Sequence, residues 1–140
     1  MRGWTADMAG AIAKVGVGLL ALPLADLPAI AAVQVRDTAP THLLLQLSAV
    51  GDGDRISALL AWADVLPDRA AYGIEREEYI RLAVTGVLDG VQVEVWTHLS
   101  GEHLVDTGCF LGLPPDDEEH ALPLGALRAL VEHRAVSTHV

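Results

Sequence analysis

An Asp-Gly pair between two runs of alternating apolar residues constrains the fold of this chain more than any other feature. Asp89-Gly90 separates Tyr79–Leu88 from Val91–Ser100. Such a pair is a strong short-range signal for a two-residue turn, so we predict an antiparallel hairpin over Tyr79–Ser100. The turn also predicts which residues face each other: Leu88 and Val91, Val87 and Gln92, Thr85 and Glu94, Val84 and Val95, Ala83 and Trp96, Leu82 and Thr97, Arg81 and His98, and Ile80 and Leu99.

The two faces of the predicted hairpin differ in chemistry. Side chains alternate between the faces of a strand, so a slip of one residue would mix the two sets. The apolar face is predicted to be core: Ile80, Leu82, Val84, Leu88, Val91, Val95 and Leu99. The other face carries Arg81, Glu94, Trp96 and His98, and it needs an explanation beyond folding.

A second hairpin and three helices are predicted around the first hairpin. The helices are expected at Thr5–Leu22, from a cap at Asp52 or Asp54 to Leu66, and at Leu122–Ala135. The second hairpin is expected from Ala31–Arg36 and His42–Ala49, with Val33, Val35, Leu43, Leu45 and Leu47 on one face. Three segments are expected to be less regular: Arg69–Glu77 and Pro114–Glu119 as loops, and Leu104–Leu113 as a further strand or a covering loop.

These elements predict one α+β domain spanning residues 1–140. The expected order is α-β-β-α-β-β-α, a two-layer arrangement with a four-stranded antiparallel sheet of two hairpins and helices on one face.

The N-terminal segment has two possible interpretations. The apolar run Val15–Ala25 follows Lys14 and precedes a small-residue motif at Ala29-Ile30-Ala31, which is the layout of a signal peptide. The same run also fits an amphipathic helix that needs tertiary or dimer contacts, because Gly10, Gly16 and Gly18 weaken it. The run is too short to span a bilayer. We expect a cytoplasmic protein with no membrane partner.

The charge of the chain restricts its partners. Nine basic residues stand against 19 acidic ones, for a net charge of −10. Binding to nucleic acid requires a basic stripe that neutralises phosphates, and the arginines here are scattered. We therefore expect no direct nucleic-acid binding. An acidic surface fits a basic protein partner, or an acidic inhibitor of the phage type that mimics nucleic acid and binds a basic enzyme.

Catalytic, metal and cofactor sites are not predicted. Cys109 is the single cysteine, so no disulfide can form within the chain, and its apolar neighbours predict a small buried residue. His98 and His103 do not have the spacing of metal ligands. A small enzyme remains an alternative, and it would require a pocket that holds these two histidines and a carboxylate with a shifted pKa.

The polar face of the sheet is the predicted binding site. Its candidate residues are Trp96, Arg81, His98, Glu94, Arg36 and Gln46. Trp and Arg are enriched in the residues that dominate protein interfaces. We therefore expect a non-enzymatic interaction module that binds a protein partner or a second copy through this face. Alternatively, the terminus or a helix of the chain itself covers Trp96.

The stretch Val84–His98 resembles a hairpin of uncharacterised small α+β proteins from high-GC bacteria and their phages. That resemblance covers the hairpin and the preceding strand–helix unit, and it implies no activity. The size, the acidity and the helix-flanked sheet are also similar to those of type III secretion chaperones, which are homodimers that bind effector segments. This second likeness concerns the fold alone.

Overall fold

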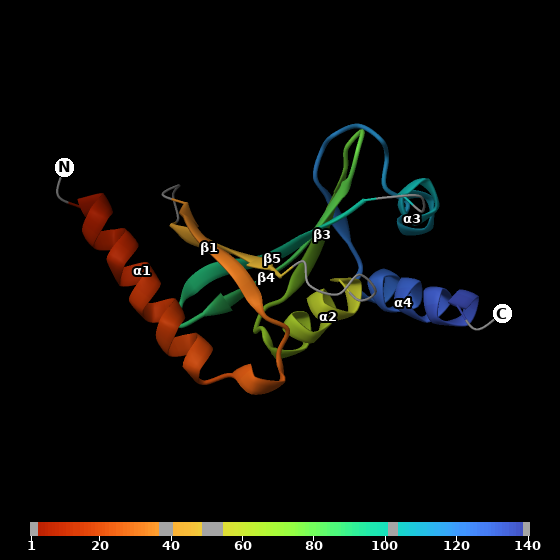
Figure 1. Cartoon of the computed structure of the whole chain (residues 1–140). Helices are drawn as coiled ribbons and strands as arrows, with labels where there is room; N and C mark the ends of the chain where they lie inside the picture. Colours follow the sequence, from red (N-terminus) through yellow and green to blue (C-terminus); the bar gives the residue numbers. More distant parts are fainter. Residues whose placement is uncertain (1–2, 37–40, 49–54, 101–103, 139–140) are drawn as a thin grey trace.

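The computed structural model describes residues 3–36, 41–48, 55–100 and 104–138, which form an α+β fold (Figure 1). Its helices are α1 (Gly3–Leu20), α2 (Arg55–Val65), α3 (Leu104–Leu111) and α4 (Leu124–Thr138), with a short 3₁₀ helix, η1, at Leu24–Asp26. Its strands are β1 (Ile30–Arg36), β2 (His42–Leu47), β3 (Ala70–Glu75), β4 (Ile80–Leu88), β5 (Val91–Leu99) and β6 (His120–Leu122). The strands make one sheet in the order β1-β2-β5-β4-β3-β6.

The predicted hairpin is confirmed in β4 and β5, and so are all eight predicted residue pairs. Asp89 and Gly90 both have positive φ, 49° and 80°. A two-residue turn with two positive φ angles matches the twist of the flanking strands, and Asp-Gly is among the pairs that best tolerate it. The local sequence therefore accounts for this part of the fold without help from distant residues.

The prediction of a four-stranded antiparallel sheet is wrong. The sheet has six strands and is mixed, because β2 lies parallel to β5 and joins the two hairpins. The additional strands are β3, in a segment expected as a loop, and β6, whose three residues are too short to give a sequence pattern. Small residues in β3 weaken the pattern that identifies a strand from the sequence. At Gly73 a Cβ atom would come within 2.9 Å of Leu122 Cδ1, so close packing leaves no room for a larger side chain.

The predicted helices are present, with shifted ends. α1 ends at Leu20 rather than Leu22, and α4 begins at Leu124 because Leu122 belongs to β6. The expected caps of α2, Asp52 and Asp54, lie outside the described residues. The segment Leu104–Leu113, expected as a strand or a loop, contains α3.

The prediction that Cys109 is buried is also wrong. Cys109 is exposed, whereas Thr107 and Leu111 of the same helix are buried. A helix turns a different set of side chains inward than a strand does, so an apolar neighbourhood in the sequence did not predict the burial of this residue.

One face of the sheet is covered by helices and forms the core. α2 packs on β2, β4 and β5, and α4 packs on α2. α1 packs near the β4–β5 turn, where it contacts β4, β5 and β2 (Figure 1). Its close approach depends on Gly18, where a Cβ atom would come within 2.8 Å of Leu88 Cβ. The predicted core residues of the hairpin all face this layer and are buried.

Within the part of the chain that the structure describes, no helix combines the length and the apolar composition needed to cross a membrane.

Candidate binding face on the open side of the sheet

The open face is the side of the sheet opposite α2. The strand registers place on it Ala32, Gln34 and Arg36 of β1, His42, Leu44 and Gln46 of β2, Gln92, Glu94, Trp96 and His98 of β5, Arg81, Ala83, Thr85 and Val87 of β4, and Tyr72 and Ile74 of β3. All six residues of the predicted site therefore lie on one face. Two apolar members, Leu44 and Ala83, are buried within it, so the face has an apolar floor beneath its polar groups.

A continuous cluster of ring and charge contacts runs along the middle of the open face. The Arg81 guanidinium carbon lies 4.8 Å from the centre of the Trp96 ring, and the rings of Trp96 and His98 are also 4.8 Å apart. Tyr79 extends the row, with its ring centre 4.3 Å from that of His98. Glu94 holds the other end, where its Oε2 accepts a hydrogen bond from Arg81 Nη2 at 2.5 Å.

The ion pair between Arg81 and Glu94 positions the Arg81 guanidinium beside the tryptophan. Their side chains are only 19% and 16% exposed, so solvent screens this pair less than it screens an ordinary surface ion pair. The pairing neutralises both charges and leaves the guanidinium plane over Trp96, which is itself partly exposed. The indole thus packs against Arg81 and His98 in the free chain, and such preorganisation lowers the entropy lost on binding.

The surroundings of His98 favour its neutral imidazole. Burial lowers its pKa, and the nearby cations Arg81 and Arg55 lower it further. Arg55, at the start of α2, also donates a hydrogen bond from Nη1 to the His98 carbonyl oxygen at 2.6 Å. A neutral imidazole can stack between Trp96 and Tyr79 without adding a second positive charge beside Arg81.

Four of the six predicted site residues are in contact with one another: Arg81, Glu94, Trp96 and His98. Gln46 lies beside this cluster, and Arg36 lies apart from it. Gln46 is the register partner of Trp96 across the parallel β2–β5 pair, so it adjoins the cluster. Arg36 pairs with His42, which in turn pairs with Gln92, at the opposite end of the strands. Arg36 is therefore on the open face but outside the cluster. His103, considered with His98 as a metal ligand, lies outside the described residues.

Sequence reasoning missed Tyr79. Tyr79 directly precedes β4 and is two residues from Arg81. Because side chains of a strand alternate between its two faces, the pattern that placed Arg81 on the open face also places Tyr79 there. Leu44 was missed because its neighbours, Leu43 and Leu45, carry the core pattern.

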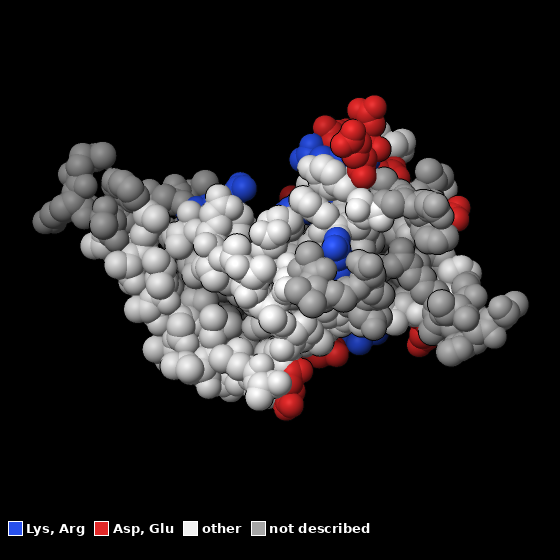
Figure 2. Space-filling model, in the orientation of Figure 1, with Lys and Arg blue, Asp and Glu red and all other residues white. Residues whose placement is uncertain are grey.

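Acidic side chains form a rim at one side of the open face. Glu77 and Glu78 are exposed and immediately precede Tyr79. The exposed run Asp116–Glu119 is joined to the same turn by an ion pair, in which Arg76 Nη1 lies 2.8 Å from Asp117 Oδ1. Figure 2 shows the surface hollowed between α1 and this acidic group. We call these acidic residues, Glu77, Glu78 and Asp116–Glu119, the acidic rim.

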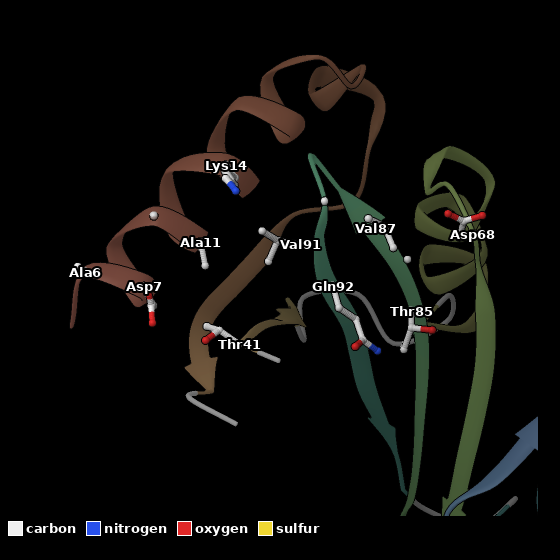
Figure 3. Close-up of a pocket in the computed structure, with 13 residues that line it drawn as sticks. Ala6, Asp7, Ala11, Lys14, Thr41, Asp68, Thr85, Val87, Val91 and Gln92 are labelled. Carbon is white, nitrogen blue, oxygen red and sulfur yellow. The ribbon is translucent and has the colours of Figure 1, made fainter. Parts of the chain in front are cut away.

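A pocket of about 460 Å³ lies where α1 passes the turn of the β4–β5 hairpin (Figure 3). Lys14 lines it from α1, and Thr85 and Gln92 line it from the sheet. Because Thr85 and Gln92 also belong to the open face, the pocket adjoins that face. Its lining comes from segments far apart in the sequence, so no local pattern predicted it.

No protein-family model, curated protein or solved structure matches this chain. The resemblance of Val84–His98 to small proteins of high-GC bacteria and phages therefore stays a prediction. The chemistry of the open face is the observation from which a function can be argued.

Proposed function

We propose that this chain is a protein-interaction module that binds a partner through the open face of its sheet. The single observation that carries the proposal is the held tryptophan: Trp96 lies between Arg81 and His98, partly exposed, on a face with an apolar floor. Interface centres are enriched in Trp, Tyr and Arg and depleted of Lys, Glu and Asp. The one acidic residue of the cluster, Glu94, is neutralised by its ion pair with Arg81. The contacts among these side chains are present in the free chain, which supports binding through this face with little rearrangement.

The expected partner presents an apolar segment flanked by lysine or arginine. The charged residues of the open face are Arg36, Arg81 and Glu94, so this face is nearly neutral. The chain as a whole has a net charge of −10. The acidic rim beside Tyr79 supplies the complementary field for a basic group. In this arrangement apolar contacts at Trp96 supply most of the affinity, whereas the rim steers association.

An acidic inhibitor that mimics nucleic acid is the second candidate, and the exposed run Asp116–Glu119 is the observation that favours it. Such an inhibitor binds its target through charge. Its binding therefore weakens steeply with salt, because the Debye length falls from ~10 Å at 0.1 M to ~3 Å at 1 M. The two candidates thus differ in what salt does to the complex.

A salt challenge of the captured complex separates the two candidates. The chain is immobilised, incubated with a soluble extract of its host, and washed at about 0.1 M and then about 1 M NaCl. We expect a specific protein to stay bound through the high-salt wash, and to associate more slowly in high salt when it is added back in purified form. Complete release at high salt would favour the acidic inhibitor and contradict binding through the Trp96 cluster.

A further inference from the structure

β1 has an open edge. It is the first strand of the sheet, and within the described ranges only β2 pairs with it. Residues 31–34 are exposed, and Val33, on the face of the sheet that bears the helices, is 58% exposed. The outer edge of this strand therefore presents backbone N–H and C=O groups that a further strand can use.

The features that normally protect an edge strand are weak in β1. The strand contains no proline and no lysine, and Arg36 at its end is the only charged residue. Its register irregularity is confined to the segment between Ile30 and Ala32, so residues 32–36 pair regularly with β2. At the opposite edge of the sheet, β6 has only three residues. The two edges therefore differ in their capacity to accept a strand.

We propose that β1 pairs antiparallel with β1 of a second copy, about a two-fold axis at Gln34. In this register Gln34 faces Gln34 of the second copy, Val33 faces Val35, and Ala32 faces Arg36. Apolar side chains meet apolar ones on the helix-bearing face, and the two amides meet at the axis. A parallel arrangement would instead place the two Arg36 side chains together, where like charges repel.

The sequence of the strand favours a second copy over a different protein. The segment Ala32–Arg36 is nearly self-complementary about Gln34, which is what an interface with two-fold symmetry requires. The two-fold pairing uses the β1 edge of both copies, and the remaining edge strand, β6, has only three residues, so the assembly closes as a dimer. Because the axis stands perpendicular to the sheet, both open faces point to the same side. The dimer would then offer two Trp96 clusters to one partner surface, which raises avidity.

A cysteine cross-link tests both the pairing and its register. Cysteine replaces Gln34 in a Cys109→Ser background, which removes the only native cysteine. Facing residues of antiparallel strands have Cα atoms about 4.5–5.5 Å apart, which fits a disulfide. We expect Gln34→Cys to form a covalent dimer of twice 14.8 kDa on mild oxidation. Arg36→Cys is the matched control on the same strand. The two copies of position 36 are offset by four residues along the paired strands, about 13 Å, so this variant should stay monomeric on a denaturing gel.

A charge exchange at the same position provides a reversible measurement. Gln34→Lys and Gln34→Glu each place like charges opposite one another, so each alone should weaken the dimer several-fold in sedimentation equilibrium. Mixing the two variants should restore association. A wild-type mass of 14.8 kDa at all concentrations, equal cross-linking of both cysteine variants, or no recovery on mixing would each overturn the proposal. Trp96→Ala should leave the dimer intact, so failure here is distinguishable from failure of the open-face proposal.

Discussion

Replacing Trp96 with alanine should reduce the affinity for the captured partner at least ~30-fold, or ~2 kcal/mol of binding free energy. The indole is the largest side chain of the open face, and it is held by Arg81 and His98 before the partner arrives. The substitution removes the apolar contact area of the indole and the cation–π contact that Arg81 makes with it. Isothermal titration calorimetry with the purified partner measures the change directly.

Phe110→Ala is the matched control for this variant. Phe110 is an aromatic residue that is 42% exposed on α3, where it stacks on His133 of α4, away from the open face. Its removal should leave the dissociation constant within about two-fold of the wild-type value, as expected for a side chain outside the interface. Equal losses from Trp96→Ala and Phe110→Ala would show that the affinity does not come from the open face.

Gly86→Ala should lower the free energy of unfolding by ~1–3 kcal/mol. Gly86 lies in β4 beneath the end of α2, where a Cβ atom would come within 2.6 Å of Leu66 Cβ and 2.9 Å of the Pro67 carbonyl oxygen. That oxygen already accepts a hydrogen bond from Val87 N at 3.1 Å, so the backbone cannot yield without losing this bond. Urea unfolding followed by far-UV circular dichroism gives the value.

Gly16→Ala is the same substitution with the opposite expected sign. A Cβ atom at Gly16 would meet nothing within 4 Å, and the residue lies inside α1. Alanine is favoured over glycine in a helix interior by up to ~1 kcal/mol, so this variant should be as stable as the wild type or more stable. If both substitutions changed the stability by the same amount, α2 would not be packed on β4 as described.

The parts of the fold that follow from local chemistry were predictable, and those that depend on distant contacts were not. The Asp89-Gly90 turn determines the register of β4 and β5 from the sequence alone. β3 escaped detection because packing against β6 and Leu113 requires glycine at position 73, which weakens the strand pattern. α3 escaped for a similar reason. Gly108 lowers its helix propensity, yet a Cβ atom there would collide with the side chain of Glu75.

The candidate site follows the same division. Strand alternation placed Arg81, Glu94, Trp96 and His98 on one face, because each is two residues from another or directly across the hairpin. The parallel pairing of β2 with β5, which brings Gln46 beside Trp96, joins segments that are 50 residues apart in the chain. The acidic rim likewise depends on the Arg76–Asp117 ion pair between two distant loops. No pattern within either segment encodes these contacts.

Site-specific photo-cross-linking tests the central claim most directly. A benzophenone amino acid is placed at Gln46 or Gln92 on the open face, and at Glu132, an exposed residue of α4, as the control. Each variant is irradiated with the captured partner, and the adducts are identified by mass spectrometry. Binding through the open face predicts partner adducts from positions 46 and 92 and none from position 132. Adducts from position 132 alone would contradict it.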